Sequence, residues 1–148
     1  MKKLFILALI AIVTGTSAFA AGTSASTKVI KHFTASFSKA KNVSWKTDSR
    51  FEKVSFEQGN EKVTVFYDTD GDLIGTSKNV AFDKLPKGAI ETITTKYTFP
   101  EYQVKECIEF SNATNEKNYY VSFDTSNETV VLEINKAGIV SVFDKIKK

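Results

Sequence analysis

The chain has 148 residues, of which 42% are hydrophobic and 25% charged, and its formal net charge is +3. Nucleic-acid binding requires a concentrated basic stripe, whereas the lysines here are scattered among glutamates, so we do not expect a nucleic-acid partner. The single cysteine excludes an intramolecular disulfide, so the fold must be stabilised mainly by burial of apolar side chains.

Residues 1–20 have the pattern of a secretory signal peptide. Two lysines precede the ten apolar residues 4–13, and Ala18-Phe19-Ala20 has the small-x-small pattern of a cleavage site. The apolar run is shorter than the roughly 20 residues that span a bilayer. We therefore expect cleavage after Ala20 and a periplasmic or secreted protein of bacterial origin that is not bound to the membrane afterwards.

Cleavage would remove Lys2 and Lys3 and no acidic residue, leaving 128 residues with 18 basic and 17 acidic side chains. Nearly balanced charge argues again for a globular protein without a polyanionic partner. We expect a flexible segment at 21–27, followed by a single domain at 28–148.

The first half of this domain predicts one helix and four strands. Apolar residues recur at helical spacing between 28 and 40, and Ser26 or Thr27 can cap the helix. The period then changes to two, which predicts strands around 43–45, 54–56, 63–67 and 73–77. The apolar residues of the helix stripe are Val29, Ile30, Phe33, Phe37 and Ala40.

The second half predicts the same order of elements. Pro86 is typical of a first helical turn, and Ala89, Ile90, Ile93 and Tyr97 share one face of the helix that follows. Alternating apolar residues then predict four strands within 102–110, 119–123, 130–134 and 140–142.

The two halves are internally similar. A shift of about 60 residues aligns the helices, and a shift of about 67 aligns the later strands and places Gly71 on Gly138. We predict an α+β fold of two tandem α-β-β-β-β repeats, about 28–80 and 86–146. The helices of both repeats are expected to pack on one face of an antiparallel sheet.

Three motifs carry a family resemblance: Phe37-x-x-Ala40-x-Asn42-Val43-x-Trp45, Tyr67-Asp68-x-Asp70-Gly71-x-Leu73, and Leu85-Pro86-x-x-Ala89-Ile90-x-x-Ile93-x-x-x-Tyr97. In order and spacing they resemble PepSY-like proteins with the fold of β-lactamase-inhibitor proteins, over residues 26–145. The resemblance implies a small exported bacterial protein without cofactor or catalysis, with a possible peptidase-regulating or inhibitor-like role. Lys136-Ala137-Gly138 departs from the pattern, where an Asp-Gly turn is typical.

The stretch Tyr67-Asp68-Thr69-Asp70-Gly71-Asp72 raises the question of a calcium loop. With Gly71 at position 6 of such a loop, Phe66 and Ser77 would occupy positions 1 and 12, where ligands are required. Asp and Gly between two strands are instead typical of a tight turn. We predict a turn and keep, as the alternative function, a small-ligand or calcium sensor that uses Asp68–Asp72; exposed carboxylates there are not expected to act as an acid/base pair.

No catalytic or metal-binding residues are predicted. His32 is the only histidine, lies off the apolar stripe of its helix, and has no spacing to a nucleophile or to other ligands. Cys107 alternates with Lys105 and Glu109, which would expose it, unless a bulge near Glu106 returns it to the core. We expect an inert thiol, with intermolecular pairing as the alternative, and neither enzyme activity nor a cofactor.

The side chains that point away from the predicted helices suggest a binding face. Most are short or charged, as an open sheet face requires. Clustered aromatic residues on such a face indicate an interaction site. We therefore expect recognition of a protein or peptide partner through an open face, with the oligomeric state left open. The candidate residues are Phe66, Tyr120, Val131, Phe143, Lys46, Lys53 and Lys62.

Overall fold

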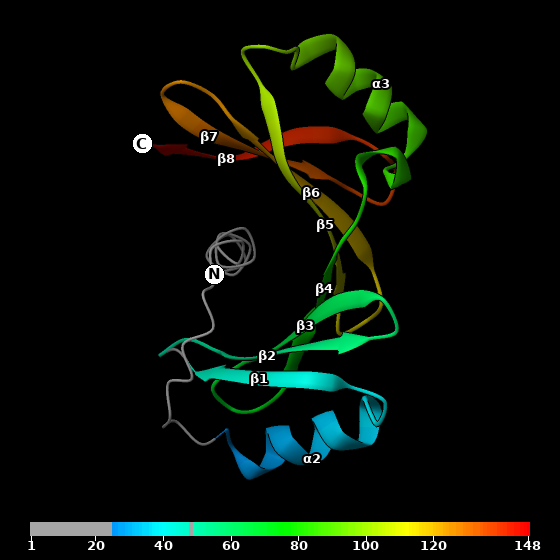
Figure 1. The fold of residues 1–148 in the computed structure, drawn as a ribbon, viewed down its shortest axis with the longest axis vertical. Helices are drawn as coiled ribbons and strands as arrows, with labels where there is room; N and C mark the ends of the chain where they lie inside the picture. The colour runs from blue at the N-terminus through cyan, green and yellow to red at the C-terminus, as the bar shows by residue number, and fades with distance from the viewer. Residues whose placement is uncertain (1–24, 48) are drawn as a thin grey trace. The chain divides into compact units, whose positions relative to one another are not determined.

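The computed structural model describes residues 25–47 and 49–148 (Figure 1). The predicted signal peptide and most of the predicted flexible segment at 21–27 lie outside the described residues. The described part contains two α-helices, a short 3₁₀ helix and eight strands, so the predicted α+β class is confirmed. The strands form one antiparallel sheet, in which they are hydrogen-bonded in chain order from β1 to β8.

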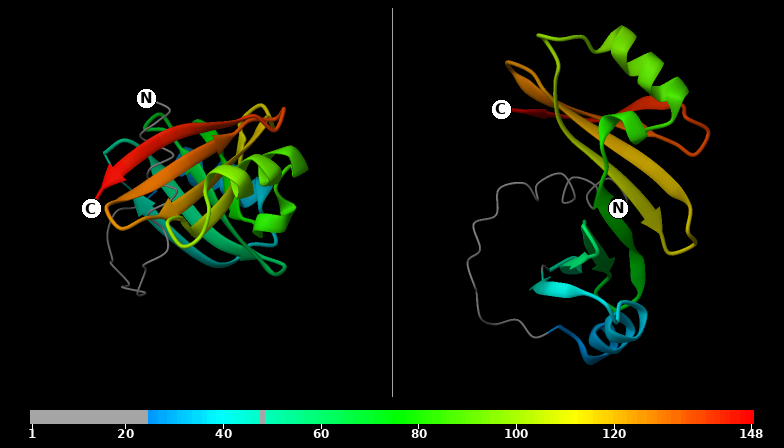
Figure 2. Two further views of the ribbon diagram at one scale, coloured as in Figure 1. Left: turned by 90° about the horizontal axis from the view of Figure 1, so that it is seen from above. Right: turned by 45° about the vertical axis from the view of Figure 1, so that its right-hand side comes forward.

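The chain divides into two compact units. The N-terminal unit comprises the described residues up to Lys78 together with Ser111–Asn115. The C-terminal unit comprises Asn79–Phe110 and Glu116–Lys148. Among the described residues, one α-helix of each unit lies against one face of the strands (Figures 1 and 2).

The helix of the N-terminal unit is α2 (Thr27–Ser36), and Ser26 is its N-cap residue. The Ser26 hydroxyl accepts a hydrogen bond from the Val29 amide at 3.4 Å, which satisfies one of the free amides of the first turn. Val29 and Phe33 are the buried residues of the helix, whereas Ile30 is 43% exposed. The predicted stripe was therefore wrong for Ile30, because the buried face of this ten-residue helix is narrower than the apolar pattern.

The strands of this unit are β1 (Lys41–Thr47), β2 (Glu52–Gln58), β3 (Glu61–Tyr67) and β4 (Leu73–Asn79). Val54 and Val65 are paired across β2 and β3, and both are fully buried beneath α2. Aromatic rings complete this core, because Phe33 contacts Trp45 and Phe56 edge-on, with ring centroids 5.2 Å apart in both pairs. Such contacts add to the stabilisation from buried area.

The C-terminal unit begins with the 3₁₀ helix η2 (Phe82–Lys84), and Pro86 then precedes α3 (Lys87–Lys96). Its strands are β5 (Gln103–Asn112), β6 (Lys117–Asp124), β7 (Glu128–Ile134) and β8 (Val140–Lys147). Ala89 and Ile93 pack on the sheet from α3, as predicted. Val121, Phe123 and other apolar residues of β6 and β7 complete the core: Val130, Leu132 and Ile134.

The turns that connect β3 to β4 and β7 to β8 have the same hydrogen bonds. Asp68 Oδ1 accepts from the amides of Asp70 and Asp72 at 3.0 and 2.8 Å. Asn135 Oδ1 accepts from the amides two and four residues later, at 2.9 and 3.0 Å. Gly71 and Gly138 have φ values of 77° and 79°, in the left-handed region that glycine tolerates best. The predicted turn at Asp68–Asp72 is thus confirmed.

Candidate functional site

We call the sheet face that lies opposite α2 or α3 in each unit the second face. Successive side chains of a strand point to opposite faces. In the N-terminal unit, Val54 and Val65 face α2, so their neighbours Lys53 and Phe66 lie on the second face. The strand register aligns Lys46 with Lys53, and Lys53 with Phe66, in one row across β1, β2 and β3.

A second row of the same face is polar. Ser55 is paired with Thr64, and their hydroxyl oxygens are 3.0 Å apart, so one hydroxyl donates to the other. Lys62, further along β3, is paired with Glu57 of β2. An opposite charge across the strands is favourable, whereas Lys46 and Lys53 place like charges opposite each other. The structure thus brings Lys46, Lys53 and Phe66 together in one row. Lys62 lies four residues before Phe66 on β3, on the same face, with Thr64 between them.

In the C-terminal unit, Tyr120 and Val131 lie on the second face, because their neighbours Val121 and Leu132 face α3. Phe143 joins them, with its ring edge-on to Tyr120 at a centroid distance of 5.4 Å. The Tyr120 hydroxyl donates to Glu133 Oε1 at 2.8 Å. Burial is the main cause that raises the pKa of Tyr120, and the bond to Glu133 adds to it, so the ring is held as a neutral phenol.

The expected exposure of these candidate residues was wrong in three cases. Phe66, Tyr120 and Val131 are 1%, 3% and 0% exposed in the full 148-residue chain. Phe143 and Lys53 are half-buried, and only two of the candidates, Lys46 and Lys62, are exposed. One physical reason is that Phe66 and Tyr120 do not stand alone on the face. Each packs edge-on against a second aromatic ring, which removes area from water.

Several residues of the second face were missed from the sequence. Phe51 immediately precedes β2, is 4% exposed and contacts Phe66 with centroids 6.0 Å apart. Ile108 and Glu106 are 3% and 7% exposed and flank Cys107 on β5. Phe51 could have been predicted, because it lies two residues before Lys53 and alternation places both side chains on the same face. Glu106 was predicted only as the position of a bulge, not as a buried residue of the second face.

The assignment of faces on β5 requires a correction. Cys107 is 5% exposed and belongs to the core beneath α3, so Glu106 and Ile108 point to the second face. The exposure of Cys107 expected from strict alternation was wrong, because β5 is buried on both faces around 106–108. The thiol is buried, which agrees with the expected inert thiol.

Because Cys107 is buried, we expect it to react slowly with thiol reagents. Burial raises the pKa of the thiol to about 11, with a smaller contribution from the charge of Glu106. The thiolate is the reactive form, so both access and ionisation are unfavourable at pH 8. Labelling with Ellman's reagent should be orders of magnitude slower in the native protein than in guanidinium chloride. Equal rates would show an accessible thiol and would reopen intermolecular pairing.

Two aspartates of the β3–β4 turn already have side-chain partners. Asp68 Oδ1 accepts two backbone amides, and Asp72 forms an ion pair with Lys28 Nζ at 2.7 Å. The hydrogen bond to Asp72 is the main cause that raises the pKa of Lys28. Within the described residues, no group of three or more acidic, histidine or cysteine side chains is arranged to hold a metal ion. No observation therefore favours a calcium sensor at this turn.

His32 connects α2 to the sheet. Its Nδ1 lies 2.9 Å from the hydroxyl of Tyr67, and the two rings meet edge-on. Tyr67 is fully buried, and burial raises its pKa to about 12. The exposed helix position predicted for His32 is confirmed, and its hydrogen bond gives it a structural role in holding α2.

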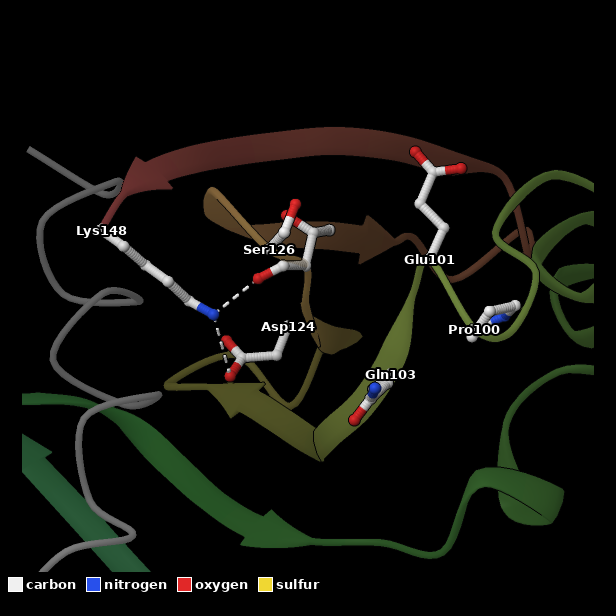
Figure 3. Close-up of a pocket in the computed structure, with 7 residues that line it drawn as sticks. Pro100, Glu101, Gln103, Asp124, Ser126 and Lys148 are labelled. Carbon is white, nitrogen blue, oxygen red and sulfur yellow. Dashed lines mark hydrogen bonds and ion pairs between the residues drawn. The ribbon is translucent and has the colours of Figure 1, made fainter.

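A hollow of about 320 Å³ lies in the C-terminal unit, and Figure 3 shows its polar lining. Lys148 Nζ donates to the Thr125 carbonyl at 2.6 Å and lies 3.5 Å from Asp124 Oδ2. The hydrogen bond from Thr129 is the main cause that lowers the pKa of Asp124, and Lys148 lowers it further. The charged groups on this side of the hollow thus bind one another, and its described lining residues include no histidine or cysteine.

Comparison with known proteins places this geometry in a known fold. No protein-family model and no curated protein sequence matches the chain. A solved DUF2874 family protein from Bacteroides uniformis ATCC 8492 is similar, with a TM-score of 0.71 and 12% identity over 84% of this chain and 90% of that chain. A BLIP-like protein from Bacteroides fragilis NCTC 9343 has a TM-score of 0.69 and 11% identity over 86% and 90%. The fold is BLIP-like.

A third similar structure, from Bacteroides eggerthii DSM 20697, is described provisionally as a periplasmic protein. Its TM-score is 0.71, with 11% identity over 84% of this chain and 90% of that chain. At such identity the likenesses show the fold alone. The PepSY-like assignment stays a prediction. Among the described residues, no helix is both long and apolar enough to cross a membrane.

Proposed function

We propose that the protein is an exported, non-enzymatic binding module that recognises a protein or peptide partner through the second face. One observation gives the main support for this proposal. Among the described residues, one α-helix of each unit covers one face of the strands, and a pair of aromatic rings lies on the opposite face, Phe51 with Phe66 and Tyr120 with Phe143. Aromatic residues are enriched in the centres of protein interfaces, where they contribute much of the binding energy.

Recognition would combine these rings with the charges beside them. In the N-terminal unit, Lys46 and Lys53 lie in one row with Phe66 and would favour acidic groups on the partner. In the C-terminal unit, Tyr120 is held by Glu133 and is therefore preorganised for contact. The mechanism requires that the partner can reach Phe66 and Tyr120 in the exported protein.

We also propose an internal duplication, a periplasmic or secreted location, and an inhibitor-like or peptidase-regulating role. The identical hydrogen bonds of the Asp68 and Asn135 turns support two tandem α-β-β-β-β repeats. The predicted cleavage after Ala20 and the description of one neighbour as periplasmic support a periplasmic or secreted protein. The BLIP-like description of another neighbour supports an inhibitor-like or peptidase-regulating role.

Replacing Phe66 and Tyr120 by alanine in one variant tests the recognition surface. We expect the exported protein to lose capture of its partner from an envelope fraction by about tenfold or more, because removing a central aromatic residue typically costs binding at least 2 kcal/mol. The measurement is quantitative pull-down, with circular dichroism to show that the variant remains folded.

Ile139→Ala is the matched control, because Ile139 is 63% exposed and lies in the turn before β8. Its capture should equal that of the unchanged protein. Unchanged capture by the double variant would refute the second face as the binding surface. Unfolding of the double variant would assign both side chains to the core instead.

A further inference from the structure

The strand β8 forms one edge of the sheet. It is last in the order β1 to β8, so β7 pairs with one side of it and no described strand pairs with the other (Figure 2). Val142 and Ile146 of β8 are 50% and 40% exposed. A strand edge presents backbone N–H and C=O groups to which an extended segment of another chain can bond. Most residues of β8 are exposed, so a partner can reach this edge directly.

The first part of β8 directs the backbone groups of two residues outward. Along an antiparallel strand, the N–H and C=O groups of consecutive residues point to opposite sides. The Ile139 carbonyl accepts from the Asn135 amide at 3.1 Å, so it points toward the β7 side. The groups of Val140 therefore point outward, those of Ser141 point toward β7, and those of Val142 point outward again.

The last part of β8 adds two more residues of this kind. The Lys148 amide donates to the Asn127 carbonyl at 3.1 Å on the β7 side, so the backbone groups of Lys147 and Lys145 point outward. In agreement with this direction, the Lys145 amide donates to Asp144 Oδ1 at 2.8 Å. We call the residues with outward backbone groups the outer edge of β8: Val140, Val142, Lys145 and Lys147.

The side chains of the outer edge form one row on the α3 face of the sheet. The two central members, Val142 and Lys145, are paired with residues of β7 that belong to the core beneath α3. An extra residue, Phe143, lies between them at the irregularity in the register. The other two members continue the same row, because alternate residues share a face. The row is therefore apolar at its start and basic at its end.

The charges of this row favour acidic groups on a partner. Lys145 and Lys147 are both exposed. Lys145 Nζ lies 3.2 Å from Glu128 Oε1, whereas Lys147 has no ion pair in the described part of the chain. Opposite charges and apolar pairs stabilise neighbouring strands when they lie directly across from each other. A complementary strand therefore has acidic side chains across from the lysines and apolar ones across from the valines.

A second copy of the chain fits the outer edge less well. If two β8 strands pair antiparallel through the whole outer edge, Lys145 and Lys147 of one copy lie across from valines of the other. No acidic residue then lies across from the lysines of either copy, so this pairing lacks the opposite charges that would favour it.

We propose that the outer edge of β8 binds an extended segment of a partner protein, antiparallel to β8, in which two alternate acidic residues precede two alternate apolar residues. The acidic side chains lie across from Lys147 and Lys145. The apolar side chains lie across from Val142 and Val140. The outward backbone groups of β8 bond to the segment as to a further strand. The inference goes beyond the proposed function, because it does not involve the second face.

Synthetic peptides test this inference on the exported, processed protein. The probe is Glu-Thr-Glu-Thr-Val-Thr-Val with an N-terminal fluorescent label, and fluorescence anisotropy measures its binding. Two N-methylated versions are compared with it. Methylation of the second glutamate and both valines blocks N–H groups that face β8, whereas methylation of the threonines blocks N–H groups that face away. We expect the first version to bind at least about tenfold more weakly than the probe, and the second to bind nearly as well.

The role of the lysines is tested by charge. A peptide with glutamine in place of both glutamates should bind about fivefold more weakly than the probe, the effect typical of two exposed ion pairs. Lys147→Gln should reduce this difference, whereas the matched control Lys87→Gln, at an exposed position of α3, should leave it unchanged. Equal reduction by the two variants would show a non-specific charge effect and overturn the inference.

Val142→Pro tests the edge itself. Proline lacks the outward N–H, and it is tolerated on an edge strand where that N–H faces solvent. The variant should remain folded in a thermal melt and bind the probe at least about tenfold more weakly. Val142→Ala, which keeps the N–H, should lose less. If Val142→Pro unfolds, the two N-methylated peptides still decide between pairing and no pairing.

The outcomes distinguish this inference from the proposed function. Equal binding of the two N-methylated peptides, or binding of none of the peptides, overturns the inference and leaves the proposed function standing. If Phe66→Ala or Tyr120→Ala abolishes binding of the probe and Val142→Pro does not, the probe binds the second face, which overturns the inference and supports the proposed function. A dimer in sedimentation that Val142→Pro dissociates would identify a second copy as the occupant and also overturn the inference.

Discussion

Replacing Phe123 by alanine is expected to lower the free energy of unfolding by about 3–5 kcal/mol, the range found for buried phenylalanines. Phe123 is 1% exposed in the core of the C-terminal unit. Its ring is stacked on Tyr97, with centroids 5.6 Å apart and planes at 16°, and meets Tyr102 edge-on. Tyr97 follows α3, so the truncation would leave a cavity where the end of this helix meets the sheet. Urea denaturation measures the loss.

Phe123→Leu is the matched comparison. Leucine keeps most of the apolar volume, so the loss should stay below about 1.5 kcal/mol. The pair distinguishes a cavity effect from a general sensitivity of β6 to substitution. A loss below 1 kcal/mol for Phe123→Ala would contradict the placement of this ring at the centre of the unit.

Gly71→Ala is expected to be the second most damaging of these changes, at about 2–4 kcal/mol. The φ of 77° costs an alanine about 1–2 kcal/mol. In addition, a Cβ at this position would lie 3.1 Å from Lys28 Cδ and 3.3 Å from Val29 Cγ2. Val29 is fully buried and cannot move aside, and a shift of Lys28 would weaken its ion pair with Asp72. Denaturant titration of the variant measures the effect.

Gly59→Ala separates the two contributions. Gly59 has a similar φ of 65°, but a Cβ there would have no atom within 4 Å. Alanine at this position should be destabilised only by the positive φ, and its lower conformational entropy in the unfolded chain offsets part of that effect. The expected net loss in the free energy of unfolding is about 1 kcal/mol. Equal losses at the two positions would show that Gly71 is not in close contact with α2.

The sequence predicted those features that depend on local chemistry. Ser26 caps α2 and Pro86 precedes α3, because both positions follow from the hydrogen bonds that the first helical turn lacks. Gly71 and Gly138 mark turns, because a positive φ suits few other residues. Residue alternation also placed Phe66, Tyr120 and Val131 correctly on the face opposite the helices.

Alternation did not reveal how deeply each face is buried. A period of two separates the two faces of a strand, but it assigns the apolar set to the core only when the other face is exposed. Around Cys107 both faces of β5 are buried, so the assumption failed there, and Glu106 was considered only as the position of a bulge. The aromatic contacts of Phe51 and Phe143 depend on tertiary packing of residues at the start of β2 and at the irregularity in β8, which no local pattern encodes.

Hydroxyl-radical footprinting of the exported, processed protein tests the central claim most directly, because it measures whether Phe66 and Tyr120 can be reached from solvent. Phe123, at 1% exposure, is the buried reference, and Phe99, at 79%, is the exposed one. Recognition through the second face predicts that, after correction for intrinsic reactivity, Phe66 and Tyr120 are oxidised faster than Phe123 and are protected when partner is added. Rates as low as that of Phe123 would show that both rings belong to a closed core, and would contradict recognition through the second face.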